Sequence, residues 1–594
     1  MTTSDTVEHV KADQLNENLK RVEQLSERLV HALSGKRKVD PNLQGPGHEL
    51  IMRASSAYIN ELMQHPSKVF EQQVTYWGKA LQNFIEAQEA LASGKLAAPD
   101  VEDDTNDPRF RHELWNSHPF FNYIKRQYLN TAEATRKAID AVEGLSDKDR
   151  ERIEFFTGQI VDMMAPTNFL ATNPEALTRA VETEGASLVK GLENLVADIE
   201  ENRGDLLVTL ADKQAFKVGE NLATTPGEVV FRNRMFELIQ YTPTTEQVYS
   251  TPLIIFPPWI NKFYVMDLKE KNSLIKWIVD QGFTLFVVSW VNPDESYADV
   301  GMDNYVEEGY LTAINEVKKI TGQKKVNVTG YCIAGTTLSL TLGLMEKRGD
   351  KSVRSATFFT TLTDFSNQGE VGVFLDEDFV GGIEREVSES GYLDKFFMSR
   401  TFSFMRSNDL IYGPAIRSYM MGEAPPAFDL LYWNGDGTNL PAKMTVEYLR
   451  GLCQGDGLAK GEFTICEEQP KLSDIKVPIC AIACETDHIA AWKSSFNGIK
   501  QMGSRDKLFI LAESGHIAGI INPPSKKKYG HYTSEGPVAG TPDEWKKGAQ
   551  FNEGSWWPRW ASWLQKRSGK KVEARQPGDS SHPALAKAPG TYVT

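Results

Sequence analysis

The sequence of 594 residues predicts an α/β fold, in which a mostly parallel sheet is covered by helices on both faces. From about residue 253 onwards, short β-branched and aromatic runs alternate with longer amphipathic stretches. The runs are apolar almost throughout, which is typical of strands buried on both faces. They are LIIF at 253, TLFVVSW at 284, KVNVTGY at 325, SATFFTTL at 355, PICAIAC at 478 and KLFILAE at 507.

The N-terminal third is predicted to be mostly helical. Apolar residues recur at spacings of three and four in residues 15–33 and again in residues 69–87, which is the pattern of amphipathic helices. An acidic stretch over 93–110 is expected to be a linker, and the helical pattern then runs from 113 to about 211. We therefore expect a helical N-terminal domain over residues 1–211. Its apolar faces either pack on other helices or a partner, or adsorb to a hydrophobic body.

The α/β part is expected to form one catalytic domain over residues 212–567. Because the gap between the strands at 355 and 478 is too long for one crossover, a cap is expected to be inserted at about 364–455. The stretch GSWWPRWASWL at 554 places tryptophans on one helical face, which predicts a final helix docked on the sheet. Residues 568–594 are rich in Pro, Gly, Ser and Lys and are expected to be a tail.

Composition and charge exclude several classes of protein. Hydrophobic residues make up 41% and charged residues 24% of the chain, as in folded proteins outside membranes. No apolar run approaches the roughly 20 residues of a transmembrane helix, and residues 1–30 lack the apolar block of a secretory signal. A formal charge of −15 disfavours a nucleic-acid partner. We expect a cytoplasmic protein without a transmembrane segment.

The cysteines are few and form no CxxC pair. This spacing argues against a disulfide framework and against a structural zinc site, so we expect no metal site and at least one free thiol. The five cysteines are Cys332, Cys453, Cys466, Cys480 and Cys484.

One of these cysteines lies in a nucleophile elbow. The strand at 325 runs directly into Gly330, Tyr331, Cys332, Ile333 and Ala334, and an apolar helical stretch follows. This is the strand, sharp turn and helix of α/β hydrolases, with Cys332 where these enzymes usually have serine. The alanine stands where the pattern has glycine, which leaves the detailed geometry of the turn open.

Later strand ends supply an acid and a base in the order that an elbow requires. Asp487 follows the strand at 478, and His516 follows the strand at 507. Both residues are expected at the sheet edge that carries Cys332, so we assign Asp487 as the acid and His516 as the base. Glu485 and His488 are the competing candidates, because a shift along the loop would exchange them.

The tetrahedral intermediate of an acyl transfer also needs oxyanion donors. The strand LIIF is followed by a stiff loop that begins Pro257-Pro258, and its Ile260 N–H is one candidate. The Ile333 N–H, directly after the nucleophile, is the other. The Pro-Pro loop is equally consistent with a plain turn.

A Cys-His-Asp triad on this sheet fits a thioesterase, a depolymerase, an acyltransferase or a polymerase. Over most of its length the chain resembles polyhydroxyalkanoate synthases. The matching stretches include PTNFLATNPE at 166, PPWINKFYVMDL at 257, GYCIAGT at 330, FDLLYWNGDGTNLP at 428, TDHIAAW at 486, ESGHIAGIINPP at 513, GSWWP at 554 and PGTYV at 589.

The resemblance implies an α/β-hydrolase fold and an enzyme that polymerises (R)-3-hydroxyacyl groups from coenzyme A thioesters, with release of coenzyme A. It implies catalytic roles for Cys332, Asp487 and His516, a single-polypeptide enzyme, a homodimer, no cofactor, and a place at the surface of polyester granules. Val291 and the run Tyr412-Gly413-Pro414 depart from the family pattern. The alternatives are a thioesterase or depolymerase of the same fold, and a granule-coat protein with a vestigial triad.

Overall fold

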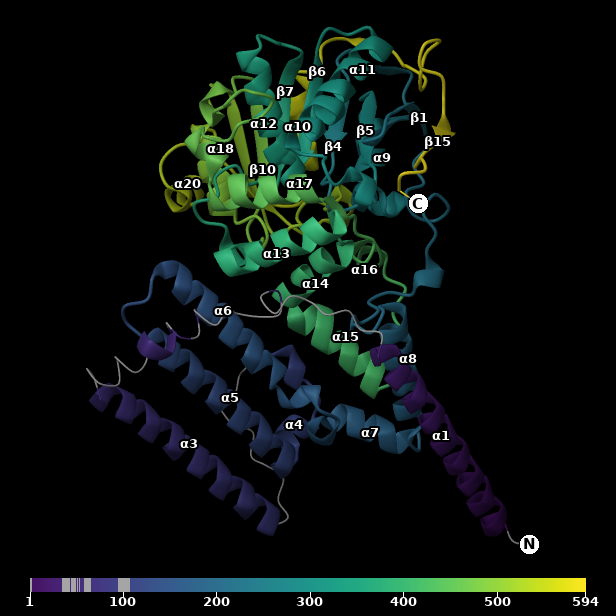
Figure 1. Cartoon of the computed structure of the whole chain (residues 1–594), viewed down its shortest axis with the longest axis vertical. Coiled ribbons are helices and arrows are strands. Elements are labelled where there is room, and N and C mark those ends of the chain that lie inside the picture. Colours follow the sequence, from purple (N-terminus) through teal and green to yellow (C-terminus); the bar gives the residue numbers. More distant parts are fainter. Residues whose placement is uncertain are drawn as a thin grey trace. The chain divides into compact units, whose positions relative to one another are not determined.

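A computed structural model of the chain divides into two compact units (Figure 1). The first unit comprises the described residues up to Asp212 together with 400–426, and the second comprises 213–399 and 427–593. The described residues are 3–34, 43, 50, 52, 54–57, 66–93 and 107–593. Most of the expected linker over 93–110 therefore lies outside the described residues.

The first unit is helical, as the sequence predicts. Both expected amphipathic helices are present, and α3 begins at Pro66, because proline is favoured in the first turn of a helix. The helices are α1 (Thr3–Ser34), α3 (Pro66–Ser93), α4 (Leu114–Ser117), α5 (Pro119–Asp140), α6 (Asp147–Met163), α7 (Pro174–Glu182), α8 (Ala186–Glu201) and α15 (Gly413–Ala415).

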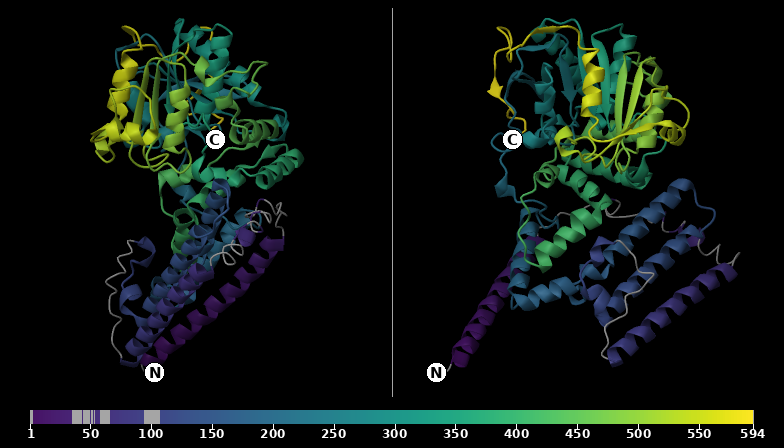
Figure 2. Two further views of the ribbon diagram at one scale, coloured as in Figure 1. Left: turned by 90° about the vertical axis from the view of Figure 1, so that its left-hand side faces the viewer. Right: turned by 180° about the vertical axis from the view of Figure 1, so that it is seen from behind.

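Within this unit, α1 packs on α8 and α3 packs on α5. Figure 2 shows the first unit in two further views, in which the long helices of its purple and dark blue segments run side by side. The apolar face of α3 predicted from residues 69–87 is not buried: Val74, Trp77, Leu81 and Phe84 keep 51–65% of their surface exposed. We call these four side chains the α3 stripe.

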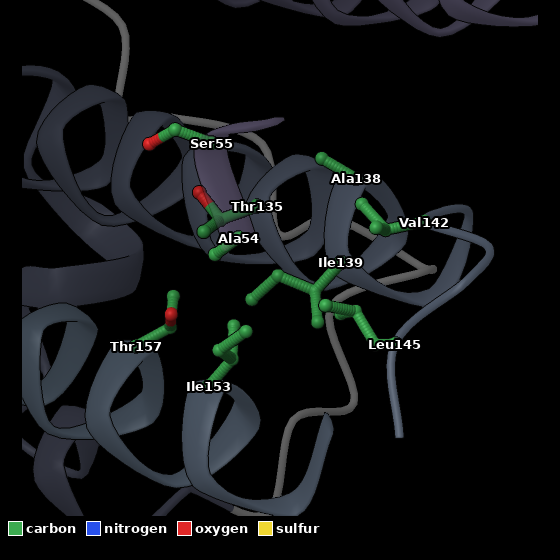
Figure 3. Close-up of a pocket in the computed structure, with 9 residues that line it drawn as sticks. All are labelled: Ala54, Ser55, Thr135, Ala138, Ile139, Val142, Leu145, Ile153 and Thr157. Carbon is green, nitrogen blue, oxygen red and sulfur yellow. The ribbon is translucent and has the colours of Figure 1, made fainter. Parts of the chain in front are cut away.

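A cavity of about 370 Å³ lies in the first unit (Figure 3). Its wall combines Ile139 of α5, Ile153 of α6 and Ala54 with the hydroxyls of Thr135 and Thr157. The cavity is therefore mainly apolar, and it belongs to a different unit from the residues predicted to be catalytic.

The second unit is built on an eleven-stranded mixed sheet with the order β13-β12-β11-β10-β7-β6-β4-β5-β2-β1-β15. Its centre, from β5 to β11, is parallel, and the strands towards both edges are antiparallel. The strands are β1 (Gly227–Arg232), β2 (Phe236–Tyr241), β4 (Leu253–Phe256), β5 (Leu285–Trp290), β6 (Val326–Tyr331), β7 (Val353–Phe359), β10 (Ile479–Cys484), β11 (Lys507–Ala512), β12 (His531–Thr533), β13 (Gln550–Asn552) and β15 (Ala586–Lys587).

Each of the six predicted strand runs forms one of these strands, so the α/β prediction is confirmed. Helices pack around the sheet, and Figure 1 shows α11 and α12 beside its strands. The helices of this unit are α9 (Leu274–Asp280), α10 (Met302–Asn304), α11 (Thr312–Thr321), α12 (Ile333–Lys347), α13 (Glu377–Ser390), α16 (Asp429–Asn434), α17 (Ala442–Val446), α18 (Gly457–Lys460), α19 (Trp492–Gln501), α20 (Pro542–Gly548) and α21 (Trp557–Gln565).

The tryptophans of α21 and of the residue before it dock on the sheet, as predicted. Trp556, Trp557 and Trp560 are fully buried in the main core. The indole of Trp560 donates to the Thr357 hydroxyl on β7 at 3.0 Å, so the polar edge of the ring is satisfied inside an apolar layer.

The segment after Ser568 is part of the fold rather than a loose tail. Its β14 (Lys571–Glu573) pairs with β3 (Gln247–Tyr249), and β15 pairs with β1 at the edge of the main sheet. Beyond β15, the Thr591 and Tyr592 N–H groups donate to the buried carboxylate of Glu237 at 2.8 and 3.0 Å. A charge-assisted contact inside β2 therefore anchors residues that the composition marks as loop.

The expected cap at 364–455 is divided between the two units. Residues 364–399 and 427–455 stay with the sheet, where β8 (Tyr392–Leu393) pairs with β9 (Leu440–Pro441). Residues 400–426, entered through α14 (Lys395–Met405), belong to the first unit. Within that unit this segment contacts α8, for example where the Tyr419 hydroxyl donates to Asp198 at 2.6 Å.

No helix among the described residues is long and apolar enough to cross a bilayer.

Candidate active site

Cys332 lies at the sharp turn between β6 and α12. Its φ of 55° and ψ of −126° are strained for a residue with a side chain. The Cys332 N–H donates to Phe359 O on β7 at 2.8 Å, which fixes the turn against the neighbouring strand. The predicted nucleophile elbow is therefore present, and it holds a partly exposed thiol at the carboxyl edge of the sheet.

The elbow depends on close backbone packing between β6 and α12. A Cβ atom on Gly330 would lie 2.6 Å from Gly335 Cα, and a Cβ atom on Gly335 would lie 2.0 Å from Thr361 Oγ1. The glycine that the turn requires is thus Gly335. Ala334 is buried beside it, and its carbonyl accepts from the Tyr310 hydroxyl at 2.8 Å, so the departure at Ala334 is accommodated.

The structure brings His516 and Asp487 together with Cys332. His516 Nδ1 lies 2.7 Å from Asp487 Oδ2, and both side chains are buried. The other Asp487 oxygen, Oδ1, accepts the N–H groups of Ile489 and Ala490 at 2.9 and 2.8 Å. Since each carboxylate oxygen has its own donors, the Asp487 side chain is fixed and orients the imidazole of His516.

Cys332 lies close enough to His516 to interact with it electrostatically. Burial alone would lower the pKa of His516, but the charge of Asp487 and the interaction with Cys332 outweigh it and raise that pKa well above its usual value. The arrangement therefore favours a protonated imidazole beside the Cys332 side chain.

The competing acid at Glu485 is engaged elsewhere. Its carboxylate pairs with Lys546 of α20, away from the imidazole that Asp487 contacts. His516 contacts Asp487 directly, through Nδ1 and Oδ2. The geometry thus favours Asp487 over Glu485 as the acid and is consistent with His516 as the base.

Of the two predicted oxyanion donors, Ile333 directly follows Cys332 in the sequence, and Ile260 follows a neighbouring strand of the sheet. Ile333 is the first residue of α12, where a backbone N–H has no acceptor inside the helix. Ile260 follows β4, the strand next to β6, and among the described residues its N–H donates no hydrogen bond. Both groups stay candidates for binding a substrate oxygen.

Sequence reasoning missed Tyr331. Its hydroxyl donates to the His516 carbonyl at 3.1 Å, and its ring lies 5.9 Å from the imidazole. Tyr331 is fully buried at the end of β6, so it fixes the loop that carries His516 after β11. Its position directly before the nucleophile was the available signal.

Within the described residues, no cluster of three or more His, Cys, Asp or Glu side chains is placed to hold a metal ion.

The sequence is similar to those of known proteins over most of its length. The family model described as "Poly-beta-hydroxybutyrate polymerase (PhaC) N-terminus" matches residues 106–278. A poly(3-hydroxyalkanoate) polymerase of Methylorubrum extorquens is 41% identical over 554 residues, which cover 93% of this chain and 91% of that protein. The chain belongs to the poly(3-hydroxyalkanoate) polymerase family.

Two further members of the family are similar over nearly the same extent. The poly(3-hydroxyalkanoate) polymerase subunit PhaC of Rhizobium meliloti (strain 1021) is 39% identical, with 90% of this chain and 89% of that protein covered. The subunit PhaC of Cupriavidus necator is also 39% identical, with 86% and 87% covered. The similarity spans both units rather than the α/β sheet alone.

The departures from the polymerase pattern lie outside the triad. Val291 directly follows β5, and its N–H donates to Met235 O at 2.9 Å. Tyr412, Gly413 and Pro414 lie on the helical segment of the first unit. Neither departure changes a contact of Cys332, His516 or Asp487.

Proposed function

We propose that this chain polymerises (R)-3-hydroxyacyl groups from coenzyme A thioesters into polyhydroxyalkanoate, with Cys332 carrying the acyl group. The observation that carries the proposal is the buried Asp487–His516 pair beside the strained thiol, in a member of a family whose relatives are named poly(3-hydroxyalkanoate) polymerases. No cofactor is needed for this chemistry, because the coenzyme A belongs to the substrate.

In the first step, the Cys332 thiolate attacks the thioester carbonyl. His516 holds the proton that left the thiol and gives it to the departing sulfur, so free coenzyme A leaves and an acyl thioester remains on Cys332. One thioester is broken and another forms, and the exchange is close to neutral in energy. The Ile333 and Ile260 N–H groups are proposed to stabilise the negative oxygen of the tetrahedral intermediate.

In the second step, the 3-hydroxyl of another acyl unit attacks the acyl group on Cys332. His516, held by Asp487, accepts the hydroxyl proton and returns it to the cysteine sulfur. A thioester is broken and an oxygen ester forms, which is downhill and drives growth of the chain. Water must be kept from the acyl-enzyme, since hydrolysis would use the same intermediate.

We also propose that the enzyme works in the cytoplasm at the surface of polyester granules, as a homodimer. The α3 stripe supports a place at an apolar surface: Val74, Trp77, Leu81 and Phe84 are exposed along one side of α3. A stripe of large apolar side chains on an amphipathic helix is typical of segments that lie on a hydrophobic boundary.

The decisive experiment follows thiol release and turbidity in one sample of purified protein with 3-hydroxybutyryl coenzyme A. Thiol release with rising turbidity is the expected result, and Cys332→Ala should abolish both while keeping the thermal unfolding midpoint. Thiol release into a clear solution would instead identify a thioesterase, and full turnover by Cys332→Ala would exclude the proposed nucleophile. An absence of turnover with retained granule binding would indicate a coat protein.

A further inference from the structure

The loop after β4, residues 257–262, is joined to a distant segment, residues 433–438. We call these the β4 loop and the clasp segment. Asn261 forms an antiparallel bridge with Gly437, and the Thr438 N–H donates to Ile260 O at 3.1 Å. The Trp433 indole donates to Lys262 O at 2.7 Å. The clasp segment thus pairs with the β4 loop by backbone hydrogen bonds, as a short extra strand would.

The Asp436 carboxylate adds two polar contacts between the clasp segment and the chain around the β4 loop. Asp436 Oδ1 lies 2.7 Å from Lys262 Nζ, and Asp436 Oδ2 accepts the Tyr264 hydroxyl at 2.8 Å. The Lys262 and Asp436 side chains are 14% and 22% exposed, and Tyr264 is fully buried. Shielded charge-assisted hydrogen bonds are stronger than ion pairs at the surface. Asp436 therefore binds both Lys262, the last residue of the β4 loop, and Tyr264, which lies just beyond the loop.

The opposite side of the β4 loop is held by the elbow helix. The buried Trp259 indole donates to the Thr337 hydroxyl on α12 at 3.3 Å. The Ile260 N–H therefore lies between two fixed neighbours, because α12 holds the Trp259 side chain and Thr438 holds the Ile260 carbonyl. The peptide that bears this N–H has little freedom left.

We propose that Asp436 is a positioning residue for the reaction: through Lys262 and Tyr264 it holds the β4 loop so that the Ile260 N–H faces the thioester oxygen as that oxygen becomes negative. The inference rests on the proposed function. The clasp segment belongs to the long insertion between β7 and β10, so the oxyanion donor is fully formed only when this part of the insertion is seated on the β4 loop.

The size of the expected effect follows from how oxyanion donors act. A donor stabilises the transition state because it is fixed before the reaction, and removing one outright costs roughly 100- to 1000-fold in kcat. Loosening the Ile260 N–H while keeping it in the chain should cost less, about 10- to 100-fold. The thioester carbonyl in the ground state gains little from this donor, so KM should stay within about threefold.

The test compares Asp436→Asn with the wild-type protein on 3-hydroxybutyryl coenzyme A. The amide still accepts the Tyr264 hydroxyl but loses the charge that binds Lys262. Lys262→Met removes the other partner, and Asp280→Asn is the matched control because Asp280 pairs with Lys276 on α9 at 2.8 Å, away from the β4 loop. Acylation is measured as coenzyme A released in the first turnover, and Cys332 reactivity is measured separately as alkylation by iodoacetamide.

The two measurements separate positioning from general damage, because alkylation uses the nucleophile but forms no oxyanion. We expect slow acylation with unchanged alkylation in Asp436→Asn and Lys262→Met, a double variant no slower than the slower single variant, and an unaffected Asp280→Asn. Unchanged acylation in a folded single variant, or equal losses of acylation and alkylation, would overturn the inference. The proposed function is read independently from turbidity with the wild-type protein and its loss in Cys332→Ala.

Discussion

Replacing Asp487 with asparagine changes one charge at the centre of the candidate site and little else in its shape. The amide oxygen can still accept the Ile489 and Ala490 N–H groups, so the loop should keep its form. The atom that faces His516 Nδ1 then belongs either to a neutral acceptor or to an NH₂ group. The first loses the charge that stabilises the imidazolium, and the second forces the imidazole into the wrong tautomer.

The magnitude follows from the contact between His516 Nδ1 and Asp487 Oδ2. It is 2.7 Å long and completely shielded on the Asp487 side, whose side chain is 0% exposed. Removing one partner of a buried charge pair costs about 3–5 kcal/mol. Because the imidazolium develops or persists in both steps, most of that loss should fall on the transition states, which corresponds to a decrease in kcat of roughly 100- to 5000-fold.

Steady-state release of coenzyme A measures this decrease, with the thermal unfolding midpoint as the check on folding. Glu485→Gln is the matched control: it removes a neighbouring carboxylate that pairs with Lys546 instead of the imidazole, and it should retain near wild-type turnover. A loss below tenfold in Asp487→Asn, or a larger loss in Glu485→Gln, would show that the acid has been assigned to the wrong residue.

Two further predictions concern stability. Gly335→Ala should lower the free energy of unfolding by about 2–3 kcal/mol, measured by denaturant melts, because its Cβ would lie 2.0 Å from Thr361 Oγ1; an unchanged midpoint would contradict the close packing of the elbow. His582 contacts Glu316 and Asp579 at 2.8 and 3.0 Å, and although burial alone would lower its pKa, these carboxylates raise it. A histidine with a raised pKa stabilises the fold below the usual pKa of about 6.5, and this contribution is lost as the pH rises through the raised pKa. The melting temperature of His582→Gln should therefore lie below that of the wild-type protein at low pH. At high pH the two melting temperatures should converge. A difference independent of pH would contradict this reading.

The central strands and the elbow could be predicted from sequence because their signals are local. Each apolar run is one strand long, and Cys332 stands between a strand and a helix that are contiguous in the chain. The residues that follow β10 and β11 were predictable for the same reason. Asp487 was assigned as the acid on the same ground, but Glu485 stayed a competitor, because the Lys546 side chain that engages Glu485 lies far along the chain.

The strand β2, towards one edge of the sheet, is an element that local hydrophobicity patterns do not predict. β2 carries Glu237, a charged residue that is fully buried, and a charge in the middle of a strand hides the strand from a hydrophobicity pattern. The charge is tolerated because Arg232 of β1 and the Thr591 N–H bind it. Thr591 comes from the stretch that composition marks as a tail. The strand β2 with its buried charge and the packing of this stretch therefore depend on each other, and neither could be predicted alone.

The membership of residues 400–426 in the first unit has a consequence for how the protein folds. Asn194 of α8 donates to Ser418 O, a contact between residues 224 positions apart. Closing a loop of that length is entropically costly, and contacts of large sequence separation form late. During synthesis, the helices before Asp212 therefore leave the ribosome without their last partner, and they must wait until much of the α/β unit has also been made. The surfaces that residues 400–426 later cover stay open during that interval, so the unfinished chain is prone to aggregation at this stage.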